Sequence, residues 1–207
     1  NTTGAGNVAV GYQALDANTT ASFNIAVGQG ALGANTTGNS NTAIGYLAMN
    51  TETQGDRNVA LGMQALQTQN FTSDTDSYNT ALGYYALRLN ETGVNNTAVG
   101  ANALDANTTG DRNVAVGTNA LTANTTASQN VAIGYGAASS NTTGIELVAI
   151  GDSALEANTT GISNVGVGED AMKANTTGNY NTAVGGNAMF ASTTGDSSTG
   201  IGYNSLA

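Results

Sequence analysis

Short apolar segments recur along the chain at a fixed distance from one another. Most of them read Asn, then Val or Thr, then Ala, an aliphatic residue and Gly, and an Ala-Leu or Ala-Met pair follows. With the first residue numbered 0, ten of the eleven intervals between copies span seventeen positions, and the interval from Asn58 to Asn79 spans twenty-one. One copy therefore holds four additional residues. The twelve copies begin at Asn7, Asn24, Asn41, Asn58, Asn79, Asn96, Asn113, Asn130, Leu147, Asn164, Asn181 and Ser198.

The positions of the repeat differ in their chemistry. Position +3 is aliphatic and position +4 is Gly in every copy, whereas position +2 is Ala except at Gly166 and Gly200. Position +7 is Ala except at Ser205, and position +8 is Leu or Met except at Ala138. Asn-Thr-Thr-Gly commonly follows from position +11. A motif repeated at one period indicates one structural unit used many times.

The pattern within one copy predicts short strands and turns. Alternating, β-branched residues at +1 to +3 favour a strand, the Gly after them favours a bend that a side chain would block, and Asn-Thr-Thr-Gly is typical of a turn. No segment is long enough for an ordinary helix. A single copy cannot bury its apolar side chains, but stacked copies can. We therefore predict an all-β fold, a parallel β-solenoid (β-roll or β-helix) of twelve coils, with one period of seventeen positions per coil. It forms one repeat domain over residues 1–207, with the four-residue insertion within 58–78.

The stacking predicts which side chains form the core. Strands about 4.8 Å apart would give twelve coils a length of roughly 58 Å. Aliphatic residues at +3 and +8 would stack inside, Asn at 0 and +11 would form hydrogen-bonded ladders, and Ala at +2 would point to the opposite face from +3. The predicted core at +3 consists of Val10, Val27, Ile44, Leu61, Leu82, Val99, Val116, Ile133, Ile150, Val167, Val184 and Ile201.

The composition excludes several classes of function. The 207 residues include no Cys, His or Trp, which removes thiol nucleophiles, disulfides and imidazole or thiolate metal ligands. The formal net charge is −10 with only four Lys and Arg residues, so nucleic acid is an unsuitable partner. No apolar run reaches the roughly 18 residues of a membrane span. No signal peptide or initiator Met is present, and we expect a segment or processed product of a longer protein.

The motifs NVAVGYQAL, NVAIGYGAA and NTAVGGNAM resemble the head repeats of YadA-type trimeric autotransporter adhesins and the repeats of bacteriophage tail-fibre proteins. The resemblance covers nearly the whole chain. It implies a left-handed parallel β-roll, three chains side by side, and an extracellular, cell-surface or virion-borne fibre that attaches to a surface, possible partners being a host glycan or protein. The repeat in this chain is longer than the usual head repeat, and neither a coiled-coil stalk nor a membrane anchor is present.

Two other functions compete with a trimeric fibre. The chain begins at position +11 of a copy and ends at position +9, so an end-to-end extracellular filament of paired terminal coils is one alternative. The recurring Thr pairs suggest an ice-binding β-solenoid as another, although adjacent Thr residues on an extended chain point to opposite sides. The Asn-Thr-Thr motifs also match N-glycosylation sequons, for which ladder and turn chemistry is the simpler interpretation.

The remaining chemistry is sparse. The insertion holds Phe71 and Tyr78, which we predict as a possible surface-binding pair because loops on rigid scaffolds often carry binding. Tyr recurs at +5, where packing is the favoured role. Carboxylates such as Asp56, Asp74 and Asp76 are too scattered to predict a calcium site. We expect no catalytic residue, no metal and no cofactor, because nothing places a base beside a nucleophile.

Overall fold

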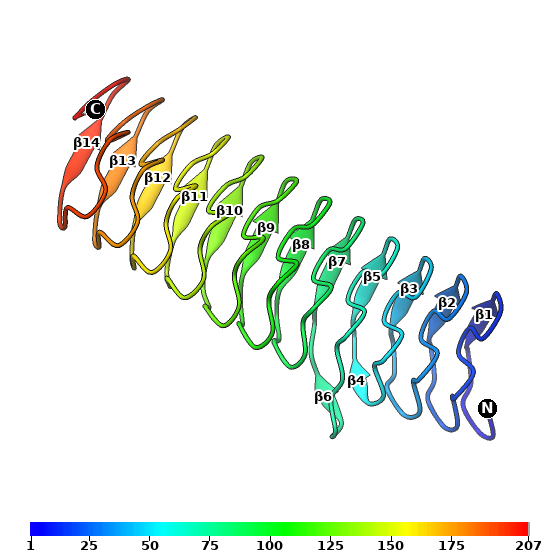
Figure 1. Ribbon diagram of the computed structural model, residues 1–207. Helices are drawn as coiled ribbons and strands as arrows, with labels where there is room; N and C mark the ends of the chain where they lie inside the picture. The colour runs from blue at the N-terminus through cyan, green and yellow to red at the C-terminus, as the bar shows by residue number, and fades with distance from the viewer. Residues whose placement is uncertain (207) are drawn as a thin grey trace.

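The computed structural model describes residues 1–206 as one straight stack of coils, and Ala207 lies outside the described residues. Figure 1 shows the coils succeeding one another from the N-terminal end to the C-terminal end, so that the described ends of the chain lie at opposite ends of a rod. Every regular element among these residues is a strand. The predicted all-β parallel solenoid is confirmed, with successive coils about 17 residues apart.

One side of the rod is a continuous parallel sheet made of the +1 to +3 segment of every copy. Each strand pairs with the equivalent residues of the next copy, as Ala115 pairs with Ala98 and Ala132. The twelve strands, in their order in the sheet, are β1 (Val8–Val10), β2 (Ile25–Val27), β3 (Thr42–Ile44), β5 (Val59–Leu61), β7 (Thr80–Leu82), β8 (Thr97–Val99), β9 (Val114–Val116), β10 (Val131–Ile133), β11 (Val148–Ile150), β12 (Val165–Val167), β13 (Thr182–Val184) and β14 (Thr199–Ile201).

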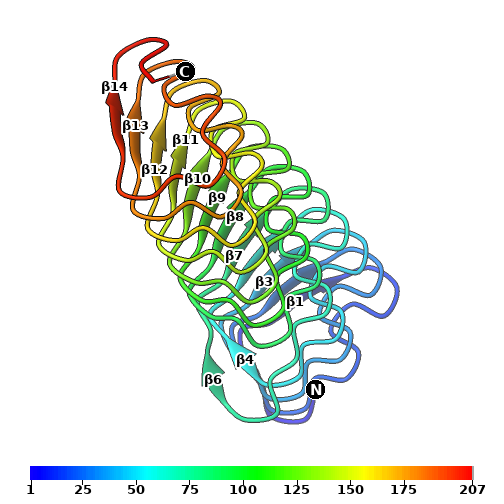
Figure 2. The ribbon, with the colours of Figure 1, turned by 60° about the vertical axis from the view of Figure 1, so that its left-hand side comes forward.

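The insertion adds a second, two-stranded sheet at the opposite end of the coil. Strand β4 (Gly55–Asp56) pairs in parallel with β6 (Thr75–Asp76). Figures 1 and 2 show β6 projecting beyond the outline of the neighbouring coils. Strands β5 and β7 remain adjacent in the large sheet (Figure 1). The additional residues therefore enlarge one coil locally without disturbing the stack.

The interior is built from small and medium apolar side chains. Ala at +2, Ala at +7 and Leu or Met at +8 are almost fully buried through the stack, and only the first and last coils expose them appreciably. The predicted stack at +8 is confirmed by Leu32, Met49, Leu66, Leu87, Leu104, Leu121, Leu155, Met172 and Met189, each at most 2% exposed.

The prediction for position +3 is wrong for the isolated chain. None of these side chains is buried: Val10 is 57% exposed, Leu61 48% and Ile133 39%. Successive residues of a strand point to opposite faces, and the inner face is taken by Ala at +2 because the narrow coil is already filled by the +8 side chains and the Asn ladders. The twelve residues on the outer face are Val10, Val27, Ile44, Leu61, Leu82, Val99, Val116, Ile133, Ile150, Val167, Val184 and Ile201.

The Gly after each strand allows adjacent coils to approach closely. Gly100 has φ +131°, and a Cβ built there would lie 2.6 Å from the carbonyl oxygen of Gly117 in the next coil. Both the backbone angle and the contact exclude a side chain. The predicted bend at this position is thus confirmed.

Non-glycine residues also adopt left-handed angles, at positions +6, +8 and +16. In one coil these are Asn119 (φ 60°), Leu121 (φ 51°) and Gln129 (φ 64°). Such a conformation costs an L-residue about 1–2 kcal/mol. It is held by backbone hydrogen bonds between coils, as from the N–H of Asn119 to the carbonyl of Ala101 at 3.0 Å. Coil stacking therefore imposes angles that the local sequence does not favour.

Asn at position 0 forms the predicted ladder, although nearly all of its links between coils run from a backbone N–H to a side-chain oxygen and not from amide to amide. The backbone N–H of Asn113 donates to Oδ1 of Asn96 at 2.9 Å, and Nδ2 of Asn113 donates to the carbonyl of Ala127 at 2.9 Å. The first bond joins adjacent coils and the second closes the coil on itself. Leu147 interrupts this ladder, and the N–H of Asn164 has no hydrogen-bond acceptor among the described residues.

Asn at +11 forms a second ladder, in which the links between coils join one side-chain amide to the next. Nδ2 of Asn124 donates to Oδ1 of Asn107 at 3.0 Å and to the carbonyl of Ala127 at 3.0 Å. The same links between side chains continue through later coils as far as Asn175. Every amide in this run is oriented the same way along the rod, so each hydrogen bond strengthens its neighbours.

Glu52 and Gln69 replace Asn at +11 in the two coils beside the insertion, and both are fully buried. Gln69 continues the ladder, because its Oε1 accepts from Asn90 at 3.2 Å and its Nε2 donates to Glu52 at 2.8 Å. The Glu52 carboxylate also accepts the backbone N–H groups of Gln54 and Gly55. A carboxylate cannot donate onward, and Oδ1 of Asn35 in the preceding coil is buried without a partner.

Candidate interaction surface

The outer face of the large sheet is the most distinctive surface of the molecule. Positions +1 and +3 of the twelve strands place 24 side chains on it, 19 aliphatic and five Thr. At about 4.8 Å per strand the face is about 53 Å long, and its two columns lie about 6.8 Å apart. Monomeric soluble proteins rarely expose a continuous apolar patch larger than a few hundred Å². A face of this extent is typical of an interaction surface.

Charge is absent from this face. All 14 Asp and Glu residues and all four Lys and Arg residues lie outside the strands of the large sheet. A protein with a net charge of −10 would repel another copy over most of its surface, but not here. The sheet face is therefore the part of the rod where a like-charged partner can approach at the lowest electrostatic cost.

Sequence reasoning missed this surface, although the sequence contained a signal for it. Position +2 is almost invariantly Ala, whereas position +3 accepts Val, Ile and Leu, and +1 accepts Val, Ile and Thr. A position fixed to one small size is typical of a narrow interior, and a position that accepts several sizes is typical of a less confined face. Size tolerance therefore favours Ala at +2 for the inner face, whereas hydrophobicity favours the residue at +3.

Tyrosines flank the sheet face at position +5. The side chains are 44% exposed at Tyr46 and 70% at Tyr12, so they do not pack inside the chain. Tyr84 stacks on Tyr85 with ring centroids 3.8 Å apart, and the Arg88 guanidinium lies 4.4 Å from the centre of the Tyr85 ring. The five tyrosines are Tyr12, Tyr46, Tyr84, Tyr135 and Tyr203.

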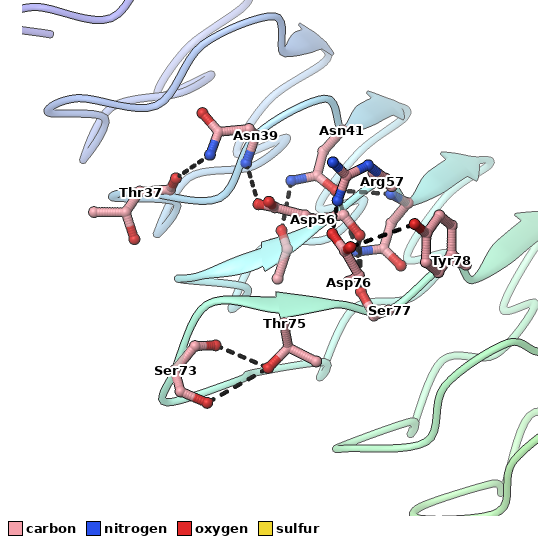
Figure 3. Close-up of polar contacts among 12 residues, drawn as sticks. Thr37, Asn39, Asn41, Asp56, Arg57, Ser73, Thr75, Asp76, Ser77 and Tyr78 are labelled. Atoms are coloured by element: carbon pink, nitrogen blue, oxygen red, sulfur yellow. Dashed lines mark hydrogen bonds and ion pairs between the residues drawn. The ribbon is translucent and has the colours of Figure 1, made fainter.

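Phe71 and Tyr78, the two aromatic residues of the insertion, do not form the predicted pair on the surface. Phe71 is only 7% exposed, which contradicts its predicted surface role, because its ring anchors the insertion against Gly55. Tyr78 is 50% exposed, and its hydroxyl lies 3.3 Å from Oδ2 of Asp76. Figure 3 shows Asp76 between Tyr78 and Arg57, with which it forms an ion pair. The insertion thus presents one aromatic residue and an ion pair, not an aromatic patch.

Two of the three carboxylates in or beside the insertion, those of Asp56 and Asp76, are paired within the chain. Asp56 accepts the backbone N–H of Asn39, one coil away (Figure 3). Burial raises the pKa of the Asp56 carboxyl above its ordinary value and the charge of Asp74 adds to the rise, while the hydrogen bond from Asn39 opposes it. Within residues 1–206 no group of three or more acidic side chains is arranged to hold a metal ion.

The Thr pairs do not form a flat array of free hydroxyls. The first Thr of each pair is largely engaged within the stack, as Thr125 donates its hydroxyl hydrogen to the carbonyl of Thr142 at 3.3 Å. The second, as at Thr126, is exposed. Only one column of hydroxyls therefore faces solvent at this corner.

In comparisons with known proteins, no protein-family model, no curated protein and no solved structure matches this chain. The part of the chain that the structure describes holds no helix long and apolar enough to cross a lipid bilayer.

Proposed function

We propose that the chain is a structural segment of an extracellular, cell-surface or virion-borne fibre, in which three copies associate through their sheet faces. The fibre spans distance and presents a surface for attachment. The observation that supports this proposal is the uncharged, aliphatic outer face that runs over all twelve strands. The resemblance of the repeats to YadA-type adhesin heads and phage tail fibres supports the same arrangement.

The chemistry of the face favours further copies of the chain over a small ligand. It is uniform from coil to coil and offers aliphatic surface with few polar groups, whereas ligand sites combine concave shape with a few placed polar groups. Three identical faces around one axis bury one another completely and leave all rods pointing in the same direction. Such an assembly keeps the acidic surfaces outside and in water.

The proposal is tested by native mass against protein concentration, measured by light scattering on a sizing column. We expect a constant mass of three chains. Val116→Asp places a charge in the centre of the face and should yield single chains whose far-ultraviolet circular dichroism is unchanged, because Val116 does not lie in the coil interior. Thr126→Asp, at an exposed corner, is the matched control and should remain trimeric.

The same measurement separates the competing functions. A mass that climbs continuously with concentration would favour the end-to-end filament. A constant single-chain mass would overturn both associations, and thermal hysteresis of the monomer would then test ice binding.

A further inference from the structure

Most of the N-glycosylation sequons of this chain lie in the core. The sequence holds eleven Asn-Xaa-Ser/Thr motifs, and in nine of them the Asn stands at +11; all of these nine except Asn1 lie in the buried ladder. Each of these eight side chains is at most 1% exposed. They are Asn18, Asn35, Asn90, Asn107, Asn124, Asn141, Asn158 and Asn175.

In six of these eight residues the amide nitrogen has no hydrogen to spare, whereas Nδ2 of Asn18 and Nδ2 of Asn35 each donate one hydrogen bond, to a backbone carbonyl. Nδ2 of Asn124 uses both of its hydrogens, one toward Asn107 Oδ1 and one toward the Ala127 carbonyl. Its own Oδ1 accepts from Asn141 at 3.1 Å. Asn90, Asn107, Asn141, Asn158 and Asn175 donate in the same double way.

N-glycosylation changes the atom on which the ladder depends. The transferase forms a bond between the Asn Nδ2 and C1 of the first sugar of a lipid-pyrophosphate-linked oligosaccharide. The C1–O bond to the pyrophosphate breaks, the lipid pyrophosphate leaves, and Nδ2 gives up one hydrogen. The modified amide has lost one of its two donors and carries a bulky polar chain that a closely packed interior cannot hold.

We propose that an N-linked glycan on any of the eight ladder asparagines is incompatible with the folded solenoid, and that Asn70 is a site where the fold tolerates one. The protein therefore matures by a route on which the ladder sequons meet no such transferase. This inference does not depend on how the rods associate, since it concerns only the interior of a single chain.

Asn70 lies in the insertion and differs from the ladder residues in every relevant respect. Its side chain is exposed, and its Oδ1 accepts a hydrogen bond from the Thr53 hydroxyl at 2.8 Å. No residue within 1–206 accepts a hydrogen bond from its Nδ2. The sequon reads Asn-Phe-Thr, with the ring of Phe71 anchored inside and Asn70 directed outward. Asn1 and Asn95 are the other exposed sequon residues.

The test compares two chains that each keep a single sequon, at Asn124 or at Asn70. In each chain every other sequon is removed. Asn-Thr-Thr sequons lose the exposed second Thr by Thr→Ala, and the sequons of Asn70 and Asn90 are removed by Thr72→Ala and Thr92→Ala. The sequon of Asn95 is removed by Thr97→Val, because Val occupies this position in other strands. Made without a transferase, the two chains should have the same melting temperature. Each is then glycosylated as an unfolded chain by a purified transferase with its lipid-linked donor, and refolded.

We expect the Asn70-glycosylated chain to regain its circular dichroism and protease resistance, and the Asn124-glycosylated chain to regain neither. Recovery of a folded, protease-resistant protein with the glycan still on Asn124 would overturn the proposal. Failure of the Asn70 form to refold would overturn the assignment of Asn70. In cells that glycosylate secreted proteins, peptide mass mapping of folded wild-type protein should find no glycan on the eight ladder residues.

Discussion

The two faces of the twelve-stranded sheet carry side chains of opposite size. The inner face presents Ala or Gly at +2 in every strand, fully buried in the central coils, whereas the outer face presents Val, Ile, Leu and Thr and remains partly or largely exposed. In an ordinary sheet the larger apolar residues lie against the core. Here the arrangement is reversed, because so short a coil has room for Leu or Met at +8 and for two Asn ladders, and then only for a methyl group.

The reversal shows that size and hydrophobicity do not by themselves identify the core. The inner face is limited by the volume of its own coil. The outer face has no such limit within the chain, and its larger side chains supply apolar area to whatever covers it. We therefore expect substitutions on the inner face to change the stability of a single chain and those on the outer face to change its association.

The largest effect on a single chain should come from removing a +8 side chain. Leu104 is fully buried between Leu87 and Leu121 of the adjacent coils, so Leu104→Ala should lower the free energy of unfolding by about 2–5 kcal/mol. Val99→Ala, on the outer face of the same coil, should cost less than about 1 kcal/mol. Denaturant unfolding at concentrations below the onset of association measures both. Equal decreases in the free energy of unfolding for the two variants would contradict the difference between the inner and outer faces.

Enlarging a side chain tests the same distinction in the other direction. Ala115→Leu forces three extra carbon atoms into a filled interior and should destabilise the chain by about 1–3 kcal/mol. Its neighbour Val116 points outward, and Leu already stands in that column at Leu61 and Leu82, so Val116→Leu should leave the thermal midpoint of the single chain nearly unchanged. A tolerated Ala115→Leu would mean that the interior is less filled than described.

A stabilising change should follow from completing the position 0 ladder. Leu147→Asn restores an Oδ1 acceptor for the unpaired N–H of Asn164, and one hydrogen bond of this kind contributes about 0.5–1.5 kcal/mol. Asn130→Leu is the converse control and should destabilise, because it removes the acceptor for the N–H of Leu147. Thermal melts of the two variants should move in opposite directions. A lower midpoint for Leu147→Asn would show that the apolar contacts of Leu147 outweigh the lost bond.

The smallest effect concerns a polar side chain outside the two faces. Because the pKa of Asp56 is raised in the folded chain, the folded state holds this proton more tightly than the unfolded chain does, and ionisation lowers stability as pH rises. Asp56→Asn keeps an acceptor for the N–H of Asn39, as Asn39 itself does for Ser22. It should raise stability at neutral pH by about 0.5 kcal/mol and by nothing at pH 3, below the ordinary Asp range. A stabilisation that persists unchanged at pH 3 would exclude the charge as its cause.

The features that recur in every copy of the repeat could be predicted from the sequence, whereas residues that occur only once or interrupt a column could not be placed. The strands, the Gly bend, the +8 stack and both Asn ladders follow from columns of one residue type at one period. Phe71 was misplaced because it occurs once, and a single copy provides no column from which to infer its direction. Glu52 and Gln69 fall in the +11 column, yet their burial depends on hydrogen bonds to each other and to backbone groups around the insertion.

The sequence by itself determined the period, the parallel stacking and the identity of the columns, because a repeat of identical units has only one register in which equivalent residues meet. Only the tertiary structure decided which side of each strand faces inward. Alternation along a strand requires +2 and +3 to lie on opposite faces, but it does not determine which of the two faces the interior. The volume inside the closed coil decides this, because it admits only the small residue at +2. That volume depends on all the residues of the coil and not on the three residues of the strand.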